Sequence, residues 1–563
     1  MLSNLYNQAD VSLKKSFLLI LCLSLGLVVL PARAQDTFGN LVRPSANGDA
    51  SINGRLVLLM PFENRSGNPS LDWIGSAFPD IFSRRLAGAN YLPLGREDRD
   101  YALNELGLPK NFDPSIAMTI HMAQMLDADY VIVGSYTVTD GRITAQAQIL
   151  NMAALTLTQP LEVQTALPQL LDAVNSLAWE IARKLDPNYA VAEQTFLAAD
   201  GKLPPAAYES YIRGITTQAL ADQITALREA IRLDPNFFPA WMQLGLAYFA
   251  DQDYQLCAET LGHLPRTYPR ATEADFYRGL SFFYLGDYMQ AENAFAFVAE
   301  TMPLPEVLNN EGVAASRRGV AAADFFRKAI AASPSNPNYH FNLAVTFDRN
   351  HDKQAAIAEL KATLRLNPND TEAQNFLTSL TTPQPPNPDP GRAVPDVDTP
   401  LERIDRHYDG ASVRQEAFEL EQVQQMRLAT LPPQKRATAL VEDGDQFLAH
   451  GLILEAESEY DEALAADSNN ALAHAGLAEV RAGTGNVAAA IQQANLSLKL
   501  KPNAEAHLVL ARVALYQNNF FEAKTQVSEA LALDPNNAEA KKLIAEMAQK
   551  QASATAQANS NTP

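Results

Sequence analysis

Few side chains in this sequence have the types and spacing that chemistry needs. Asp127 and Asp129 form an Asp-x-Asp pair, which suits a divalent cation, but this spacing alone is common and does not predict a metal site. His121 lies in an apolar stretch with no cysteine or second histidine nearby, which favours a packed or surface histidine over a ligand. No glycine-rich phosphate loop, H-E-x-x-H or G-x-S-x-G pattern occurs. We therefore expect no catalytic residues, no metal and no cofactor, and a protein that is not an enzyme.

Charge and cysteine content exclude further classes. The chain of 563 residues has a net charge of −21, and its first 34 residues carry three basic residues and one acidic residue, so the remainder carries −23. This acidity argues against nucleic acid and anionic lipid as partners. Of the two cysteines, Cys22 lies near the start, so no disulfide can form within the rest of the chain. Cys257 is expected to be a small buried hydrophobe.

The first residues have the features of a secretory signal peptide. Two lysines precede an apolar run over residues 17–30, and an Ala-Arg-Ala cleavage site ends at Ala34. The run is shorter than the about 20 residues that span a bilayer, so we expect residues 1–34 to be removed, with an uncleaved anchor as the alternative. Residues 35–54 predict a flexible lead-in. No later stretch is long and apolar enough for stable membrane insertion.

Residues 55–190 predict an α/β domain with a mixed sheet and helices. The continuous apolar run at 55–61 indicates a strand buried on both faces. Asp140-Gly141 predicts a hairpin turn, because apolar and polar residues alternate after it. Further strands are expected at residues 91–94, 130–133 and 155–163, and helices at 71–86, 115–126 and 170–185.

Two stretches of this domain resemble the amino-terminal domain of the TolB family. Residues 59–68 read Leu-Met-Pro-Phe-Glu-Asn-Arg-Ser-Gly-Asn and are followed by Leu-Asp-Trp at 71–73, similar to the opening of that domain. Residues 128–136 read Ala-Asp-Tyr-Val-Ile-Val-Gly-Ser-Tyr, similar to its later strand. The resemblance implies a non-catalytic domain of the bacterial envelope that contributes protein contacts. Pro79, inside the first expected helix, departs from the pattern.

A helical pattern recurs about every 34 residues over residues 201–381. Each unit has a small residue where its two helices approach, and a proline that stops the second helix. The small residues are Gly214, Gly245, Gly279, Gly312 and Ala344, and the closing prolines are Pro235, Pro269, Pro303, Pro334 and Pro368. The pattern closely resembles the tetratricopeptide repeat (TPR) family, which implies an all-α superhelix. This stretch, block 1, would hold about five repeats plus a half-repeat.

The pattern resumes over residues 436–552, block 2, with three repeats and a capping helix. Between the blocks, residues 382–412 are rich in proline and predict an extended linker, with a proline-rich docking ligand as the alternative. Residues 413–435 predict a helix that caps block 2. The tail, residues 553–563, is rich in Ala, Ser, Asn and Gln and is expected to be disordered.

The concave face of such a superhelix is lined by the first helix of each pair. By helical spacing, the side chains expected to point into this groove are Met242, Phe276, Phe283, Tyr284, Asn310, Phe341 and Asn342. The aromatic rings could bury a ligand segment, and the two amides could bond its backbone. The alternative is that the aromatic residues belong to the core, as aromatic residues at helical spacing usually do.

The combined prediction is an exported, non-catalytic adaptor or scaffold that binds proteins or peptide segments on its concave TPR surface. The resemblances imply a Gram-negative-type periplasm as its location. Two alternatives remain open. In one, the α/β domain senses a small ligand and the repeats relay the signal; in the other, the chain is an envelope scaffold that self-associates.

Overall fold

The computed structural model describes residues 56–89, 91–110, 112–198, 203–382, 400–410 and 423–560. The expected signal peptide and lead-in, residues 1–54, lie outside the described residues. All described residues belong to one compact unit.

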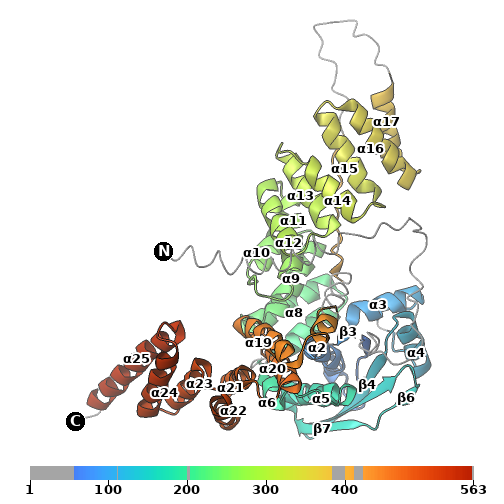
Figure 1. The fold of residues 1–563 in the computed structure, drawn as a ribbon. Coiled ribbons are helices and arrows are strands. Elements are labelled where there is room, and N and C mark those ends of the chain that lie inside the picture. Colours follow the sequence, from blue (N-terminus) through green and yellow to red (C-terminus); the bar gives the residue numbers. More distant parts are fainter. Residues whose placement is uncertain are drawn as a thin grey trace. The chain divides into compact units, whose positions relative to one another are not determined.

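A mixed sheet with helices forms the amino-terminal part of the described chain (Figure 1). Strand β4 (Tyr130–Thr139) pairs in parallel with β1 (Leu56–Leu59) and antiparallel with β5 (Arg142–Asn151). The sheet order is β3-β1-β4-β5-β6, with β2 paired to β4 and β7 paired to β5. The remaining strands are β2 (Glu63–Asn64), β3 (Leu92–Leu94), β6 (Thr156–Leu157) and β7 (Leu161–Ala166).

Both faces of β1 are covered, which explains its continuous apolar sequence. Val57 and Leu59 pack in one core with helices α2 (Trp73–Ala87) and α5 (Leu170–Leu185). Leu58 points the other way and packs with α3 (Arg96–Glu105) and α4 (Ile116–Met125). Successive side chains of a strand point to opposite faces, so a strand between two helical layers must be apolar throughout.

Pro79 is accommodated inside α2 by a change of hydrogen-bond partner. A proline has no N–H to donate to the carbonyl four residues earlier, which here belongs to Gly75. That carbonyl instead accepts the backbone N–H of Phe62 at 2.9 Å. The proline therefore frees an acceptor that attaches α2 to the chain leaving β1.

The expected hairpin and one unexpected helix complete this part of the chain. Asp140 and Gly141 have φ values of 51° and 72°, as a tight two-residue hairpin turn requires. Helix α3 was not predicted, because most of its residues are charged and only Ala102 and Leu103 are buried. A short helix, α6 (Glu193–Ala198), leads towards the repeats.

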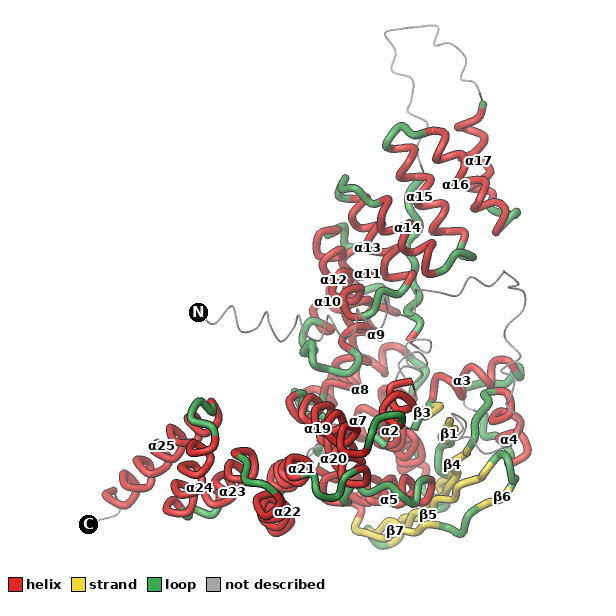
Figure 2. Tube along the Cα trace, in the orientation of Figure 1, coloured by secondary structure: helices red, strands yellow, loops and turns green. Residues whose placement is uncertain are grey.

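Residues 203–382 form successive antiparallel helix pairs followed by a single helix (Figure 2). A small residue on the first helix allows close packing on the second, because a Cβ added at Gly279 would lie 2.7 Å from the ring of Phe295. At Gly312 the same atom would lie 2.9 Å from the ring of Phe326. The helices are α7 (Pro205–Thr216), α8 (Leu220–Leu233), α9 (Phe238–Ala250), α10 (Tyr254–Leu261), α11 (Ala271–Tyr284), α12 (Tyr288–Thr301), α13 (Pro305–Arg317), α14 (Ala323–Ala332), α15 (Pro337–Arg349), α16 (Lys353–Leu366) and α17 (Thr371–Thr381).

Block 2 repeats this construction. The ring of Tyr460 fills the space beside Gly444 and Gly476. Residues 423–429 of the expected capping helix are helical. Its first part, residues 413–422, lies outside the described residues. The helices are α19 (Pro433–Ala449), α20 (Ile453–Ala466), α21 (Ala471–Gly483), α22 (Val487–Leu500), α23 (Ala504–Tyr516), α24 (Phe520–Leu533) and α25 (Ala538–Ser560).

The end of α25 corrects the prediction of a disordered tail from residue 553. The helix continues to Ser560, and only residues 561–563 lie outside the description. The tail contains several alanines, and alanine has the highest intrinsic helix propensity of all residues. Low hydrophobicity therefore did not prevent the last helix from extending.

The α/β part and block 1 share one hydrophobic core. Ile81 of α2 and Tyr208 of α7 belong to the same buried cluster. The hydroxyl of Tyr208 donates to the carboxylate of Asp80 on α2 at 2.7 Å. Helix α2 thus packs on α7, the first helix of the repeats.

We expect Gly279→Ala to destabilise block 1 by about 1–3 kcal/mol, because its new methyl group would overlap the buried ring of Phe295. Gly483→Ala is the matched control, since Gly483 also lies in a helix and nothing lies within 4 Å of an added Cβ. Urea unfolding followed by circular dichroism measures both variants. Equal free energies of unfolding would contradict the requirement for a small residue at position 279.

Candidate functional site

A segment of the chain itself lies in the groove of block 1. Residues 400–410, here called the docked segment, read Pro-Leu-Glu-Arg-Ile-Asp-Arg-His-Tyr-Asp-Gly. They contact α11, α13 and α15 and the start of α17, and residues 400–409 form neither helix nor strand. The sequence predicts that these residues belong to an extended linker over 382–412. The structure assigns this part of that range to a bound segment.

Two asparagine side chains hold the backbone of the docked segment. The backbone N–H of Asp405 donates to Oδ1 of Asn310 at 2.8 Å, and its carbonyl accepts from Nδ2 at 2.7 Å. Asn342 makes the same pair of bonds to Arg403, at 2.6 Å and 2.8 Å. Both amides are fully buried, so these bonds satisfy groups that would otherwise be left without water or partner.

The repeat spacing matches the spacing of an extended peptide. Asn310 lies on α13 and Asn342 on α15, the first helices of successive pairs. They bind residues 405 and 403, which are two positions apart. Side chains and backbone groups two residues apart in an extended chain face the same way, about 6.6 Å apart. Successive repeats therefore bind alternate residues of the docked segment.

A third amide completes this row. Nδ2 of Asn309 donates to the carbonyl of Arg403 at 3.1 Å, and its Oδ1 accepts from Nδ2 of Asn342 at 2.7 Å. Asn309 is also fully buried. It links the two backbone-binding asparagines to one another and fixes their orientation.

Glu402 occupies a subsite formed by positively charged side chains. Its carboxylate is 0% exposed and forms an ion pair with Nε of Arg317 at 3.0 Å. Arg349 and the hydroxyl of Ser316 also contact this carboxylate. Two guanidinium groups and a hydroxyl on α13 and α15 thus converge on one acidic side chain.

Arg403 occupies a neighbouring subsite of opposite charge. Its guanidinium group donates to both carboxylate oxygens of Asp370, at 2.6 Å and 2.9 Å, and to Glu372 at 2.7 Å. It lies 3.6 Å from the centre of the Phe341 ring, a cation–π arrangement. The bonds from Arg403 lower the pKa of Asp370, so the pair is stable above the ordinary pKa of an aspartate and weakens as pH falls through the lowered value.

The other end of the docked segment is apolar. Ile404 packs beside the clusters around α11 to α15, and Tyr408 is almost fully buried. The ring of Tyr408 lies 5.3 Å from that of Phe276, and its hydroxyl is 3.0 Å from that of Thr272. Arg406 and His407 between them are exposed.

The structure places six of the seven predicted groove residues beside the docked segment. Asn310, Asn342, Phe341 and Phe276 contact it as described above. Tyr284 lies 5.4 Å from the guanidinium carbon of Arg406, and Phe283 lies 5.8 Å from that of Arg317, which binds Glu402.

Met242 is the exception among the predicted groove residues. Its side chain is fully buried in the core that α9 shares with the neighbouring helices. Helical spacing alone does not distinguish a core position from the adjacent groove position, and Met242 belongs to the core and not to the residues beside the docked segment. Whether the other six bind a partner stays a prediction.

Several groove residues were missed because their signal is not local. Arg317, Arg349 and Asp370 occupy ends of helices, where charged side chains are usually solvated. Asn309 carries a weak signal, since it is adjacent to Asn310 and would have been found by treating the pair together. Only the stacking of α13, α15 and α17 shows that these side chains line one groove.

Of the residues considered first for chemistry, Asp129 and Cys257 have structural roles. Oδ2 of Asp129 accepts the backbone N–H of Leu56 at 2.9 Å, and His121 is exposed. Cys257 is fully buried, and burial raises the pKa of its thiol to about 11, so it stays protonated at neutral pH. Within the described residues, no group of three or more His, Cys, Asp or Glu side chains could hold a metal ion.

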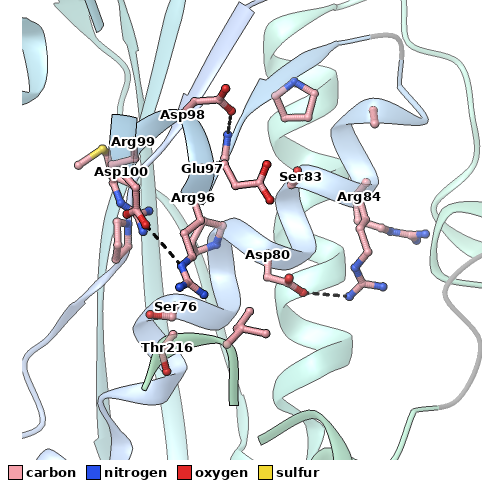
Figure 3. Close-up of a pocket in the computed structure, with 18 of the residues that line it drawn as sticks. Ser76, Asp80, Ser83, Arg84, Arg96, Glu97, Asp98, Arg99, Asp100 and Thr216 are labelled. Carbon is pink, nitrogen blue, oxygen red and sulfur yellow. Dashed lines mark hydrogen bonds and ion pairs between the residues drawn. The ribbon is translucent and has the colours of Figure 1, made fainter. Parts of the chain in front are cut away.

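A charged cleft of about 2170 Å³ passes between α2 and α3 (Figure 3). Several of its charged side chains have partners within the cleft. Asp80 contacts Arg84 at 3.6 Å, Asp100 contacts Arg96 at 3.9 Å, and Asp98 accepts the backbone N–H of Gly95 at 2.8 Å. At these positions the cleft presents charges that are already paired or bonded to the backbone.

Comparison with known families places the groove in a recognised repeat. Models of the tetratricopeptide repeat match residues 276–337, 314–380 and 442–505. The chain contains tetratricopeptide repeats. The first two TPR matches include Asn309, Asn310 and Asn342, and the third lies in block 2. These matched residues do not include the α/β part, so its resemblance to the TolB domain stays a prediction.

Solved structures match at low identity. YrrB, described as a TPR protein with an unusual peptide-binding site, is 14% identical, covers 36% of this chain and 97% of its own, and has a TM-score of 0.29. A MamA fragment from Desulfovibrio magneticus RS-1 is 18% identical, covers 30% and 99%, and scores 0.28. The LpoB carboxy-terminal domain from Salmonella enterica is 15% identical, covers 21% and 87%, and scores 0.18. These likenesses carry no information on function.

No curated protein matches the sequence. Among the helices of the described residues, none combines the length and the apolar character needed to cross a membrane.

We expect Asn310→Ala/Asn342→Ala to weaken docking of residues 400–410 by about 2–4 kcal/mol, because four hydrogen bonds to the backbone are lost. Hydrogen exchange read at the amides of residues 403 and 405 should become at least about tenfold faster. Asn350→Ala, on the exposed end of α15, is the control. Unchanged exchange at both amides in the double variant would show that the asparagines do not hold the segment.

Proposed function

We propose that this protein is an adaptor whose TPR groove in block 1 captures extended segments of partner proteins. The observation that carries the proposal is the hydrogen bonding of Asn310 and Asn342 to the backbone of residues 405 and 403. Backbone bonds of this kind are available to any extended chain. The groove therefore has the chemistry to hold a segment of another protein in the same way.

The composition of the groove supports a protein partner. Its buried amides suit peptide groups, and its rings, Phe276 and Phe341, suit apolar or cationic side chains. The net charge of −21 disfavours nucleic acid. TPR domains generally act by such contacts and not by catalysis, and we extend this role to the present chain.

The proposed location is the bacterial cell envelope, in a periplasm of the Gram-negative type. The leader-like sequence of residues 1–34 supports export, and the TolB-like stretches of residues 55–185 support an envelope role for the α/β domain. In this proposal the α/β domain adds non-catalytic protein contacts, and its shared core with α7 fixes it to the groove-bearing repeats.

Peptide binding in trans tests the groove. In an open variant of the full chain, residues 402–408 are replaced by Gly-Ser-Gly-Ser-Gly-Ser-Gly, which removes the docked side chains. We expect a fluorescein-labelled copy of residues 400–410 to bind this variant with a Kd of about 1–100 µM by fluorescence anisotropy. Asn310→Ala/Asn342→Ala in the same background should abolish binding, and Asn350→Ala should retain it.

The open variant must first be shown to be folded, by circular dichroism and a cooperative thermal transition. If the folded protein binds no peptide, or binds it equally after loss of both asparagines, the proposed function of this groove is wrong.

Export gives an independent test of the location. When the full chain is produced in a Gram-negative host, we expect osmotic shock to release a protein whose first residue is Gln35. An Ala34→Arg variant should keep its leader, because the small residue before the cleavage site is lost. A wild-type product that retains Met1 and stays in the cytoplasm would contradict the proposed location.

A further inference from the structure

The docked segment also indicates which partner sequences the groove selects. We propose that the groove takes an extended peptide in which an acidic residue is followed directly by an arginine, and that residues 400–410 occupy this place in the free chain until such a partner displaces them. This inference rests on the proposed function and adds the chemistry of the partner and the regulation of the same groove.

The acidic position is specified by Arg317 and Arg349. Both guanidinium groups contact the carboxylate of Glu402, whose side chain is completely shielded from solvent. A neutral side chain at this position would leave two partly buried positive charges close together without an acceptor. An uncompensated buried charge is costly, so the subsite favours a carboxylate over other side chains of similar size.

The arginine position is specified by shape as well as charge. Asp370 accepts two parallel N–H bonds from the guanidinium of Arg403, and Asn338 accepts a further one at 3.1 Å. The guanidinium carbon also lies 3.6 Å from the centre of the Phe341 ring. A lysine could supply the charge but neither the paired bonds nor the planar stacking, so arginine is preferred.

The order of the two residues matters because of the extended backbone. Adjacent side chains of an extended chain point in opposite directions, and the asparagine bonds fix residue 403 in register. Exchanging the two would bring an arginine to Arg317 and Arg349, and a glutamate to Asp370 and Glu372. Like charges would then meet at both subsites, which provides discrimination by repulsion as well as by attraction.

The docked segment is bound mainly through contacts that another peptide can reproduce. Backbone bonds and the two charged subsites carry the contacts of residues 402–405, whereas Leu401 is 60% exposed and Arg406 and His407 are exposed. The segment is covalently joined to the repeats, so a partner competes with an effective concentration on the order of millimolar. Binding of a partner in trans should therefore be weakened while the segment is in place.

Three full-length proteins and one labelled peptide test the competition. The peptide is the fluorescein-labelled copy of residues 400–410, and the proteins are the wild type, the E402Q/R403Q variant and the open variant. We expect the open variant to bind most tightly, E402Q/R403Q more weakly, and the wild type at least about tenfold more weakly than the open variant. A His407→Ala chain, changed at an exposed position of the segment, should behave as the wild type.

Changes in the peptide test the sequence preference. Binding to the open variant should fall at least about 30-fold when the peptide carries Arg-Glu in place of Glu-Arg, which corresponds to about 2 kcal/mol. A peptide with the histidine replaced by alanine should bind like the original. Substituting lysine for the arginine should give an intermediate loss.

The outcomes separate this inference from the proposed function. Equal binding of the peptide by wild type and open variant would overturn the competition, and equal binding of the Glu-Arg and Arg-Glu peptides would overturn the sequence preference; the groove would remain a peptide site in both cases. If no folded variant binds any peptide, the proposed function itself fails. If the open variant does not fold, the Arg403→Lys variant takes its place. We expect this variant to bind the labelled peptide at least about threefold more tightly than the wild type does. Unchanged peptide binding would contradict the competition.

Discussion

The groove depends on the close approach of the two helices in each repeat. At Gly312 a single methyl group would come within 2.9 Å of Phe326, and at Gly279 one would come within 2.7 Å of Phe295. This tight packing places the first helices side by side at a regular interval, because each second helix lies behind its partner. The interval in turn puts Asn310 and Asn342 where alternate residues of an extended chain can meet them.

In this regular stack of repeats, different residues contact the backbone and the side chains of the docked segment. Asparagines in successive repeats bind the backbone, which any sequence supplies, whereas charged side chains at the helix ends bind the side chains of Glu402 and Arg403. Contacts to the backbone and contacts to side chains thus come from different positions in the same groove. A TPR scaffold can keep its backbone-binding positions and change its selectivity through a few charged residues.

The sequence predicted the repeats and part of the groove, because small residues, closing prolines and helical spacing are local signals. Asn310 and Asn342 follow from that spacing, and Met242 shows its limit, since adjacent helix faces cannot be told apart without the packing. The docking of residues 400–410 was not predictable in this way. Their composition is that of a linker, and the partners of Glu402 lie more than 50 residues away and meet only after the repeats stack.

The docked segment also has a mechanical consequence. It spans from Thr272 on α11 to Asp370 at the start of α17, with fixed contacts to each first helix in between. Repeat stacks bend and twist through small rotations between neighbouring units. A chain bound along the inner side at fixed intervals resists any rotation that changes those intervals. Block 1 should therefore be elastically stiffer with its groove filled than with its groove empty.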